Sequence, residues 1–237
     1  MSDRVALVTG AGKGIGHEVA RQLAADGFTV LATGRDAERG EAAARELDGD
    51  VRFVRLDVTD QDTVRAAAAY VSETFGRLDL LVNNAGITGI ARGQRKELDD
   101  LTVEDLREVL ETNFVGVFAV TQAMLPLLRK ASGRVVNLTS ALATFGRVVQ
   151  DGVQRPDLLP YVTAKSAMNM ASVVYAAALK DAGVSVYSVS PGYVATDMNN
   201  FAGTKTVEEG AAVIVRAATG AELPERALLV ETGTLPW

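Results

Sequence analysis

The sequence predicts an α/β fold of one domain, residues 1–237, in which helices cover both faces of a seven-stranded parallel sheet. Short runs rich in β-branched residues alternate with longer segments of helical periodicity, a pattern typical of parallel sheets packed between helices. No Pro/Gly/Ser-rich linker or internal repeat divides the chain. With 48% hydrophobic and 23% charged residues, the chain can fill one sizeable core, which argues against disorder.

These runs predict seven strands and six helices. The strands cover residues 4–9, 29–33, 51–56, 78–82, 134–139, 184–189 and 227–231. The helices cover residues 14–25, 37–47, 60–75, 103–130, 161–181 and 207–219. Several helices begin with a hydroxyl three residues before a carboxylate, the pattern of a capping box, at Thr206/Glu209, Thr102/Asp105 and Thr59/Asp62. Residues 86–101 and 141–160 are long irregular stretches, which in a compact domain are more often functional than accidental.

Composition excludes several classes of function. The net charge of −6 and the pI of about 5.0 disfavour nucleic-acid binding, which needs a concentrated basic surface. Cysteine is absent and His17 is the single histidine, so disulfides, thiolate metal sites and histidine metal clusters are excluded. The first residues do not read as a secretory signal, and no stretch looks long enough to span a membrane. We therefore expect a cytoplasmic protein that binds neither nucleic acid nor membrane.

A glycine-rich turn follows the first predicted strand and opens the first helix. It contains Gly10, Gly12, Lys13, Gly14, Ile15 and Gly16. Glycines let a backbone turn tightly and approach a pyrophosphate, while free amides at a helix start attract its charge. The spacing is not the bare GxGxxG pattern, and a tight turn alone would also explain it. Its position in the first strand–helix unit nevertheless favours a dinucleotide site in a Rossmann-type, doubly wound fold.

The second strand ends at Gly34-Arg35-Asp36, where the adenosine ribose of a dinucleotide would lie. An acidic residue at this point would bind the ribose 2′-hydroxyl, whereas a cation accommodates a 2′-phosphate. Arg35 and Lys13 together therefore predict NADP(H). Asp36 could pair with Arg35 or cap the next helix, and we favour the cap because Asp is a preferred N-cap residue. The alternative for Arg35 is an ordinary surface cation.

Tyr161 and Lys165 lie four residues apart at the start of a predicted helix, which places them on one helix face. A neighbouring cation stabilises a phenolate and brings its pKa closer to neutral. Tyr161 could then donate a proton to a carbonyl oxygen as hydride arrives, and remove it in the reverse direction. Ser140 ends a strand at the carboxyl edge of the sheet and could hydrogen-bond the same carbonyl, with Thr139 as a substitute. Chance placement on an amphipathic helix, and a plain turn serine, are the alternatives.

With these residues in view, the sequence resembles the short-chain dehydrogenase/reductase family over essentially its full length. The family's motifs occur here in the family's order: TGAGKGIG at residues 9–16, Asp57, NNAG at residues 83–86, Asn113, Ser140, Tyr161 with Lys165, and Pro191-Gly192 with Thr196. Any one of them could arise by chance, but the ordered set is specific to the family.

The resemblance implies a role for each matched residue. Asp57 and Val58 would contact the adenine ring, and Asn113 would lie at an irregularity in the fourth helix and hold a water that links Lys165 to solvent. Tyr161 and Lys165 would also contact the cofactor. The remaining cofactor contacts would come from Asn84, Ala85, Gly86, Pro191, Gly192, Val194 and Thr196. A turn or a cap is the alternative for Asp57 and Asn113, since Asp and Asn are common there.

Within the family, the chain is most similar to the NADPH-dependent carbonyl reductases. Lys13, the 34–36 strand end, the Glu-Glu-Gly-Ala helix start at 208–211, the tail ending in Trp237 and the long separation of Ser140 from Tyr161 carry this similarity. The resemblance implies NADPH-dependent reduction of a ketone or aldehyde, or the reverse alcohol oxidation. A non-catalytic NADP(H)-binding regulator on the same fold is the alternative.

Substrate choice is expected to depend on residues 87–101, 141–160 and 193–205, which would border the open nicotinamide face. Phe145, Tyr193, Met198 and Phe201 are candidates for an apolar pocket wall or for ordinary loop packing. The arginines at 92, 95, 147 and 155 could attract an anionic substrate or be solvated loop charges. Family members associate through the two long helices, and the insertion before the second covers that surface in carbonyl reductases, so a monomer is favoured over a dimer or tetramer.

Overall fold

One sheet of eight strands forms the centre of the computed structural model, which describes residues 4–237 apart from 91–93, 153–154, 221–222, 225–226 and 236. The strand order is β3-β2-β1-β4-β5-β6-β7-β8. The strands are β1 (Val5–Val8), β2 (Thr29–Gly34), β3 (Val51–Arg55), β4 (Leu80–Asn83), β5 (Arg134–Leu138), β6 (Ser185–Val189), β7 (Leu228–Val230) and β8 (Gly233–Leu235). The described helices are α1 (Gly14–Ala25), α2 (Ala37–Arg45), α3 (Gln61–Thr74), α4 (Val103–Leu110), α5 (Gly116–Ala131), α6 (Phe145–Asp151), α7 (Leu159–Leu179) and α8 (Val207–Thr219).

All seven predicted strands are present, and the sheet contains an eighth strand, β8, that was not predicted. β8 is a three-residue strand that pairs antiparallel with β7, whereas every other neighbouring pair is parallel. Gly233 makes this return with a φ of 135°, a conformation that an L side chain disfavours. A strand of this length carries too little periodicity to be recognised in the sequence.

Three helical predictions need correction. The fourth helix is α4 and α5 joined by a π-helical segment, η2 (Glu111–Val115). The stretch 141–160 is not irregular throughout, because it contains α6 and two short 3₁₀ turns, η3 (Ala141–Ala143) and η4 (Pro156–Leu158). Asp60 rather than Thr59 caps α3, because the Asp60 side chain accepts from the amides of Asp62 and Thr63. The Thr59 hydroxyl donates to Asp57 instead. The capping boxes at Thr102 and Thr206 are confirmed.

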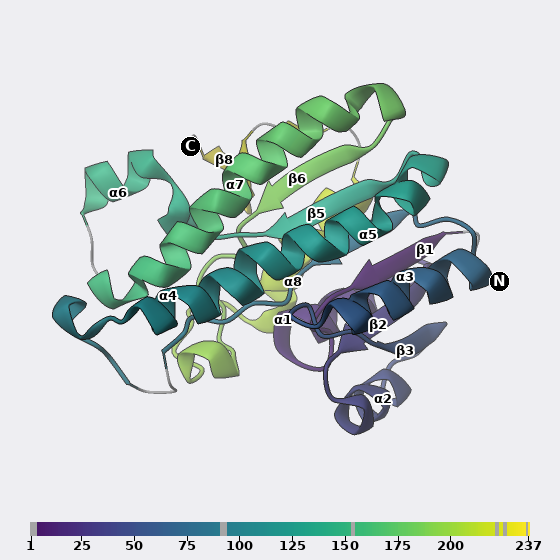
Figure 1. Ribbon diagram of the computed structural model, residues 1–237, viewed down its shortest axis with the longest axis horizontal. Coiled ribbons are helices and arrows are strands. Elements are labelled where there is room, and N and C mark those ends of the chain that lie inside the picture. The colour runs from purple at the N-terminus through teal and green to yellow at the C-terminus, as the bar shows by residue number, and fades with distance from the viewer. Residues whose placement is uncertain (1–3, 91–93, 153–154, 221–222, 225–226, 236) are drawn as a thin grey trace.

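The helices form a layer on each face of the sheet (Figure 1). Alternate residues of each strand face opposite layers, as strand geometry requires: Ala6 and Val8 belong to one apolar core and Val5 and Leu7 to the other. Helices α1 and α8 bury their apolar faces in the first core, and α3, α5 and α7 in the second. The fold is thus the predicted doubly wound type.

The stretch Val103–Ala131 corrects a further expectation, because by length and composition it could cross a membrane. It has 29 residues, and its most apolar window of 18 residues reaches a mean hydropathy of 1.2. Its apolar residues have a packing role in this fold, since Val120, Met124 and Leu128 are fully buried against the second core. A helix packed against a sheet needs the same apolar content, so composition alone is weak evidence for a span.

The parallel strands bring their carboxyl ends to one edge of the sheet, on the left in Figure 1. The chain passes from β1 to β2 and β3 on one side and returns to β4 on the other, so the strand order reverses between β1 and β4. Open α/β sheets bind ligands in the crevice at such a switch point. Helix α6 and the 3₁₀ turn η6 (Asp197–Asn199) lie beyond this same edge (Figure 1).

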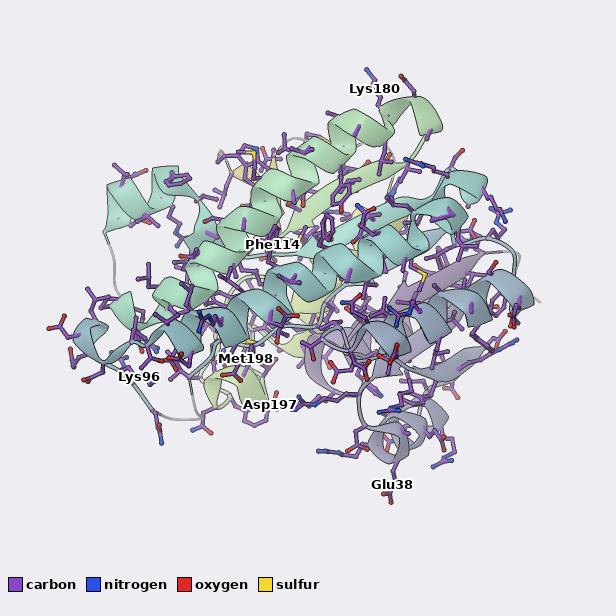
Figure 2. All side chains as sticks on the ribbon, in the orientation of Figure 1. Glu38, Lys96, Phe114, Lys180, Asp197 and Met198 are labelled. Carbon is purple, nitrogen blue, oxygen red and sulfur yellow. The ribbon has the colours of Figure 1, made fainter. Side chains whose placement is uncertain are left out.

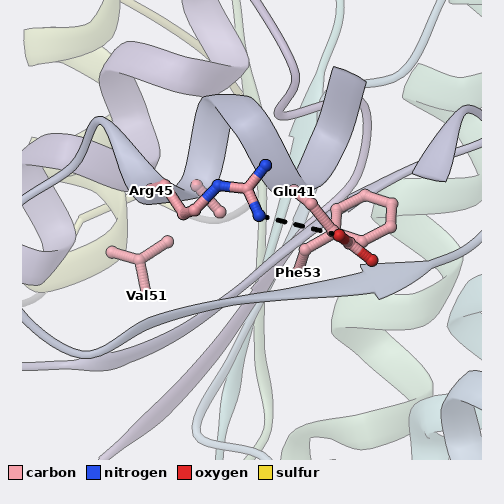
Figure 3. Close-up of a pocket in the computed structure, with 5 residues that line it drawn as sticks. Glu41, Arg45, Val51 and Phe53 are labelled. Atoms are coloured by element: carbon pink, nitrogen blue, oxygen red, sulfur yellow. Dashed lines mark ion pairs between the residues drawn. The ribbon is translucent and has the colours of Figure 1, made fainter. Parts of the chain in front are cut away.

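A shallow recess of about 220 Å³ lies between α2 and β3 (Figure 3). Ala44, Val51 and Phe53 line it, and an ion pair of 3.8 Å between Glu41 and Arg45 spans it. None of these residues is among the predicted site residues, and the apolar part of the lining is ordinary packing of α2 on the sheet edge.

Candidate active site

The glycine turn is locked to the end of β4 by Thr9 and Asn84. The Thr9 hydroxyl accepts hydrogen bonds of 3.0 Å from the Asn84 and Ala85 amides, and Asn84 Nδ2 donates to the carbonyls of Thr9 and Gly10 at 2.8 and 3.1 Å. A Cβ on Gly16 would lie 2.3 Å from Asn84 Nδ2, so only glycine fits there. Asn84 therefore holds the turn in shape across the switch point.

The rest of the turn is open. Nothing lies within 4 Å of a Cβ built on Gly12, whereas Gly10 and Gly14 have φ of 65° and 57°, which glycine adopts most readily. Side chains cap α2, α3, α4 and α8, but no side chain caps α1, and its first turn holds no acidic residue. Free amides at an uncapped helix start, next to an open glycine backbone, fit a pyrophosphate group. Ile15 lies in this first turn and packs against the first core.

At the end of β2, Asp36 caps the next helix, α2, as the sequence predicts. Asp36 accepts from the Arg39 amide at 3.1 Å and pairs with the Arg39 guanidinium, so it does not pair with Arg35. The Arg39 amide and guanidinium hold the pKa of Asp36 below its usual value. Arg35 is exposed, and among the described residues its guanidinium has no ion-pair partner. Lys13 pairs instead with Asp197.

Asp57 and Val58 occupy the turn after β3. One Asp57 oxygen, Oδ1, accepts from the Thr59 amide at 3.0 Å and from its hydroxyl at 2.8 Å, which is the turn role proposed as the alternative. The Val58 side chain is buried in the second core, and Gly116 at the start of α5 allows the close approach of its backbone. Only the second carboxylate oxygen of Asp57 and the Val58 backbone are left for a ligand.

Asn113 lies within η2, so the expected irregularity in the helix is present. Its side chain is fully buried and forms two hydrogen bonds with the backbone of Ile87. Oδ1 accepts from the Ile87 amide at 2.8 Å, and Nδ2 donates to the Ile87 carbonyl at 2.7 Å. A Cβ on Gly86 would lie 3.1 Å from Asn113 Oδ1 and 3.5 Å from Lys165 Nζ. Asn113 thus fixes the chain after β4 directly beside Lys165, and its water-holding role stays a prediction.

Lys165 is buried with 4% of its surface exposed, and its Nζ donates to the Leu138 carbonyl at 2.7 Å. Nζ also lies 5.9 Å from the centre of the Tyr161 ring. Burial lowers the pKa of Lys165 to about 8, because desolvation disfavours the charged ammonium. The group remains mostly cationic at neutral pH.

The expected effect of Lys165 on Tyr161 is not found in this structure. Burial raises the pKa of the Tyr161 phenol, and a hydrogen bond with Ser140 opposes that rise without overcoming it. The Lys165 ammonium donates to the Leu138 carbonyl at the end of β5 and not to the Tyr161 hydroxyl. At neutral pH the phenol therefore keeps its proton.

Ser140 is fixed by the turn that follows it, η3. Its Oγ accepts from the Leu142 amide at 3.2 Å, and the Ala141 amide donates to Ser190 Oγ at 3.1 Å. The Ala143 carbonyl accepts from Ser166 Oγ at 3.0 Å and from Asn169 Nδ2 at 3.2 Å, both on α7. These bonds tie Ser140 to the helix that carries Tyr161.

The segment after β6 closes the site from the other side. Gly192 has a φ of 85°, and Thr196 forms a capping box with Asn199 in η6. Val194 is buried against Gly210 in the first turn of α8, which leaves mainly its backbone to contact a cofactor. Pro191 precedes Gly192 in the same turn.

The four candidates for the pocket wall are exposed and not packed in loops. Their exposed fractions are 76% for Phe145, 53% for Tyr193, 45% for Met198 and 64% for Phe201. Met198 is visible on η6 in Figure 2. Of the loop arginines, Arg147 pairs with Asp151, Arg155 forms two hydrogen bonds of 2.7 and 2.6 Å with the buried Asp157, and Arg92 lies outside the described residues.

Sequence reasoning missed several residues that organise the site. Asn169 and Ser166 hold the turn after Ser140, and Asp197 binds Lys13. Asn169 could have been found, because it lies two helical turns after Tyr161 and one after Lys165, on the same helix face. Within the described part of the chain, no group of His, Cys, Asp or Glu has the arrangement of a metal site.

Fold and site together define a doubly wound α/β protein with a buried lysine, a tyrosine and a serine beside an open glycine turn. A family model described as short chain dehydrogenase matches residues 4–207. The chain therefore belongs to the short-chain dehydrogenase family, a family of oxidoreductases.

Individual relatives agree with this. Short-chain dehydrogenase anuI of Penicillium roqueforti is 37% identical over 226 residues, which cover 90% of this chain and 87% of the relative. (+)-Neomenthol dehydrogenase of Arabidopsis thaliana is 34% identical, with 91% of each chain covered. The structure of NADPH-bound carbonyl reductase from chicken fatty liver superposes with a TM-score of 0.84 at 28% identity, covering 100% of both chains.

Proposed function

We propose that the protein reduces a ketone or aldehyde with NADPH, or oxidises the corresponding alcohol in reverse. The observation that carries this proposal is the cluster of Tyr161, Ser140 and Lys165 beside the open glycine turn. The cofactor would supply a hydride to the carbonyl carbon. The Tyr161 hydroxyl would give its proton to the carbonyl oxygen, so that C=O becomes CH–OH.

The protonation state of the site suits proton donation to a carbonyl oxygen. Because burial raises the pKa of Tyr161, the phenol holds a proton for the substrate oxygen throughout the neutral range. The hydrogen bond between Ser140 and Tyr161 places the serine hydroxyl where it can orient the same oxygen. Lys165, cationic at neutral pH, would stabilise negative charge on that oxygen or on Tyr161 as the proton moves.

The charges around the adenosine end support NADPH as the partner. The carboxylate of Asp36 is committed to the α2 cap and to Arg39, which leaves no acidic group at the β2 tip for a ribose 2′-hydroxyl. Arg35 remains exposed beside that tip, and Lys13 lies in the neighbouring turn. Arg35 and Lys13 are two cations, and no free carboxylate at the tip of β2 competes with a phosphate for them, so this end of the site suits a 2′-phosphate.

The substrate is expected to present an apolar surface. Phe145 on α6 and Tyr193, Met198 and Phe201 after β6 expose their side chains on segments beyond the carboxyl edge. Exposed apolar groups on segments that flank a site gain free energy when a ligand covers them, at about 25 cal/mol per Å². The loop arginines Arg147 and Arg155 are each paired with a carboxylate, which argues against their recruiting an anionic substrate. Among the described loop arginines, the exposed Arg95 is left for that role.

The structure bears on whether the protein is a monomer or a dimer. The monomer expectation depended on the insertion covering the long helices, but α6 lies off to one side of the N-terminal half of α7 (Figure 1). Val115, Phe118, Met170 and Val174 on η2, α5 and α7 are exposed. We therefore propose a monomer or a dimer with no preference between them. Sedimentation of the purified protein at micromolar concentration decides which of the two states it adopts. We also keep a cytoplasmic location as a proposal.

A panel of ketones, quinones and aldehydes with NADPH and with NADH tests the proposal. We expect turnover of apolar carbonyl compounds with NADPH, and its loss in Tyr161→Phe with NADPH binding nearly intact. Tyr70→Phe, an exposed tyrosine on α3, is the matched control. Near-normal turnover in Tyr161→Phe would refute the role of the phenol. Tight NADPH binding without turnover of any carbonyl would favour a regulator.

A further inference from the structure

An ion pair links the two sides of the cofactor edge. Lys13 in the glycine turn pairs with Asp197 on η6, 184 positions away in the sequence. The neighbouring residues also approach each other here, since a Cβ on Gly14 would lie 3.7 Å from the side-chain methyl Cγ2 of Thr196. Asp197 is visible on η6 in Figure 2, beside Met198. The pair therefore connects the phosphate-binding turn to the substrate-side segment.

The two partners differ in how firmly they are held. Asp197 opens η6, whose backbone is fixed by the Thr196/Asn199 capping box and by a bond of 2.8 Å from Asn199 Nδ2 to the Val194 carbonyl. Its side chain is only 26% exposed. The Lys13 side chain is 75% exposed on a flexible four-carbon stem. Lys13 can therefore turn to another anion, while the Asp197 carboxylate stays in place.

We propose that Asp197 tunes the discrimination between NADPH and NADH by competing with the 2′-phosphate for Lys13. This inference rests on the proposed function, in which Lys13 and Arg35 receive that phosphate. An ammonium that is already paired with a carboxylate binds a second anion more weakly, because it must weaken or share the first ion pair to do so. Among the described residues no ion pair restrains Arg35, so Lys13 is the adjustable contact of the two.

Removal of the Asp197 charge should favour NADPH selectively. Asp197→Asn keeps the size of the side chain but leaves Lys13 without this carboxylate. Exposed ion pairs have small energies, so the ratio of NADPH to NADH affinity should rise by about twofold to fivefold. A general gain in negative-ligand binding would raise both affinities alike, because both cofactors carry the pyrophosphate.

Equilibrium titration of NADPH and NADH, followed by cofactor fluorescence, measures this ratio in the wild type, Asp197→Asn, Lys13→Met and the double variant. We expect the ratio to rise in Asp197→Asn and to fall in Lys13→Met, with no further effect of Asp197→Asn when Lys13 is absent. Asp151→Asn, which removes the partner of Arg147 on α6, is the control. An unchanged ratio in Asp197→Asn, or the same rise in the Lys13→Met background, would overturn the inference.

The same titration separates this inference from the proposed function. A wild type that binds NADH as tightly as NADPH contradicts the proposed cofactor preference, yet a rise in the ratio in Asp197→Asn would still support competition at Lys13. A wild type that prefers NADPH, with a ratio unaffected by Asp197→Asn, contradicts the inference alone.

Discussion

Lys165 is predicted to destabilise the fold that it serves. Its pKa is about 8 in the folded protein against 10.5 for a free lysine side chain. Each pKa unit corresponds to about 1.4 kcal/mol, so keeping this buried ammonium charged at pH 7 costs about 3 kcal/mol of folding free energy. Lys165→Met removes that cost. The substitution also leaves the Leu138 carbonyl without its donor at 2.7 Å, which costs about 1 kcal/mol of stability and offsets part of the gain. The variant should be about 2 kcal/mol more stable at pH 7 and inactive.

The pH dependence identifies the cause. Between pH 8 and 10.5 the unfolded chain holds the Lys165 proton and the folded protein does not, so wild-type stability rises with pH over this window. By pH 9.5 about 2 kcal/mol of the penalty is gone, and the advantage of Lys165→Met shrinks by that amount. Other groups titrate in both proteins and cancel in the difference. Urea denaturation followed by circular dichroism at pH 7 and 9.5 measures both values.

Lys180→Met provides the control, because Lys180 is exposed at the opposite end of the α7 region (Figure 2). It should show no pH-dependent difference from the wild type. If Lys165→Met were less stable than the wild type by the same amount at both pH values, the buried charge would not be the source of the effect. The reasoning about desolvation at this site would then be wrong.

Four further substitutions test other parts of the molecule. Gly16→Ala would place a Cβ 2.3 Å from Asn84 Nδ2 and should lower stability by about 1–3 kcal/mol in urea denaturation. Gly12→Ala meets nothing within 4 Å, so it should keep wild-type stability and lose cofactor affinity by titration; matched losses of stability in both would contradict this. Asn169→Ala removes a donor to the Ala143 carbonyl and should lower kcat severalfold with little change in cofactor affinity, whereas an unchanged kcat excludes a positioning role. Thr206→Ala should cost about 1 kcal/mol through loss of the α8 cap, seen as a lower Tm, and an unchanged Tm would show that the cap is dispensable.

Local sequence signals predicted the elements that have strong periodicity or specific turn chemistry. The strand–helix alternation, the glycine turn and the caps at Asp36, Thr102 and Thr206 each depend on a few adjacent residues. The three-residue β8 and α6 lack such a signal, because short elements depend on what they pack against. The same spacing rule that placed Tyr161 beside Lys165 would also have selected Asn169.

Electrostatics could not be predicted in the same way. The sequence places a cation near Tyr161, which by itself lowers the pKa of a phenol. In the fold, the ammonium of Lys165 faces the Leu138 carbonyl, and both groups are removed from water, so desolvation raises one pKa and lowers the other. Likewise, Lys13 and Asp197 are brought together only by the path of the whole chain. Such effects depend on burial and long-range contacts, which spacing does not encode.

The catalytic geometry depends on the end of β5 more than on the insertion before Tyr161. Lys165 is bonded to Leu138 at the last position of that strand, and Ser140 follows two residues later. The turn after Ser140 is held in turn by Ser166 and Asn169 on α7. Helix α6 provides none of these bonds. Changes in α6, such as Phe145→Ser, should therefore alter KM for the carbonyl substrate and leave the hydride-transfer step, measured by its isotope effect with deuterated cofactor, close to that of the wild type.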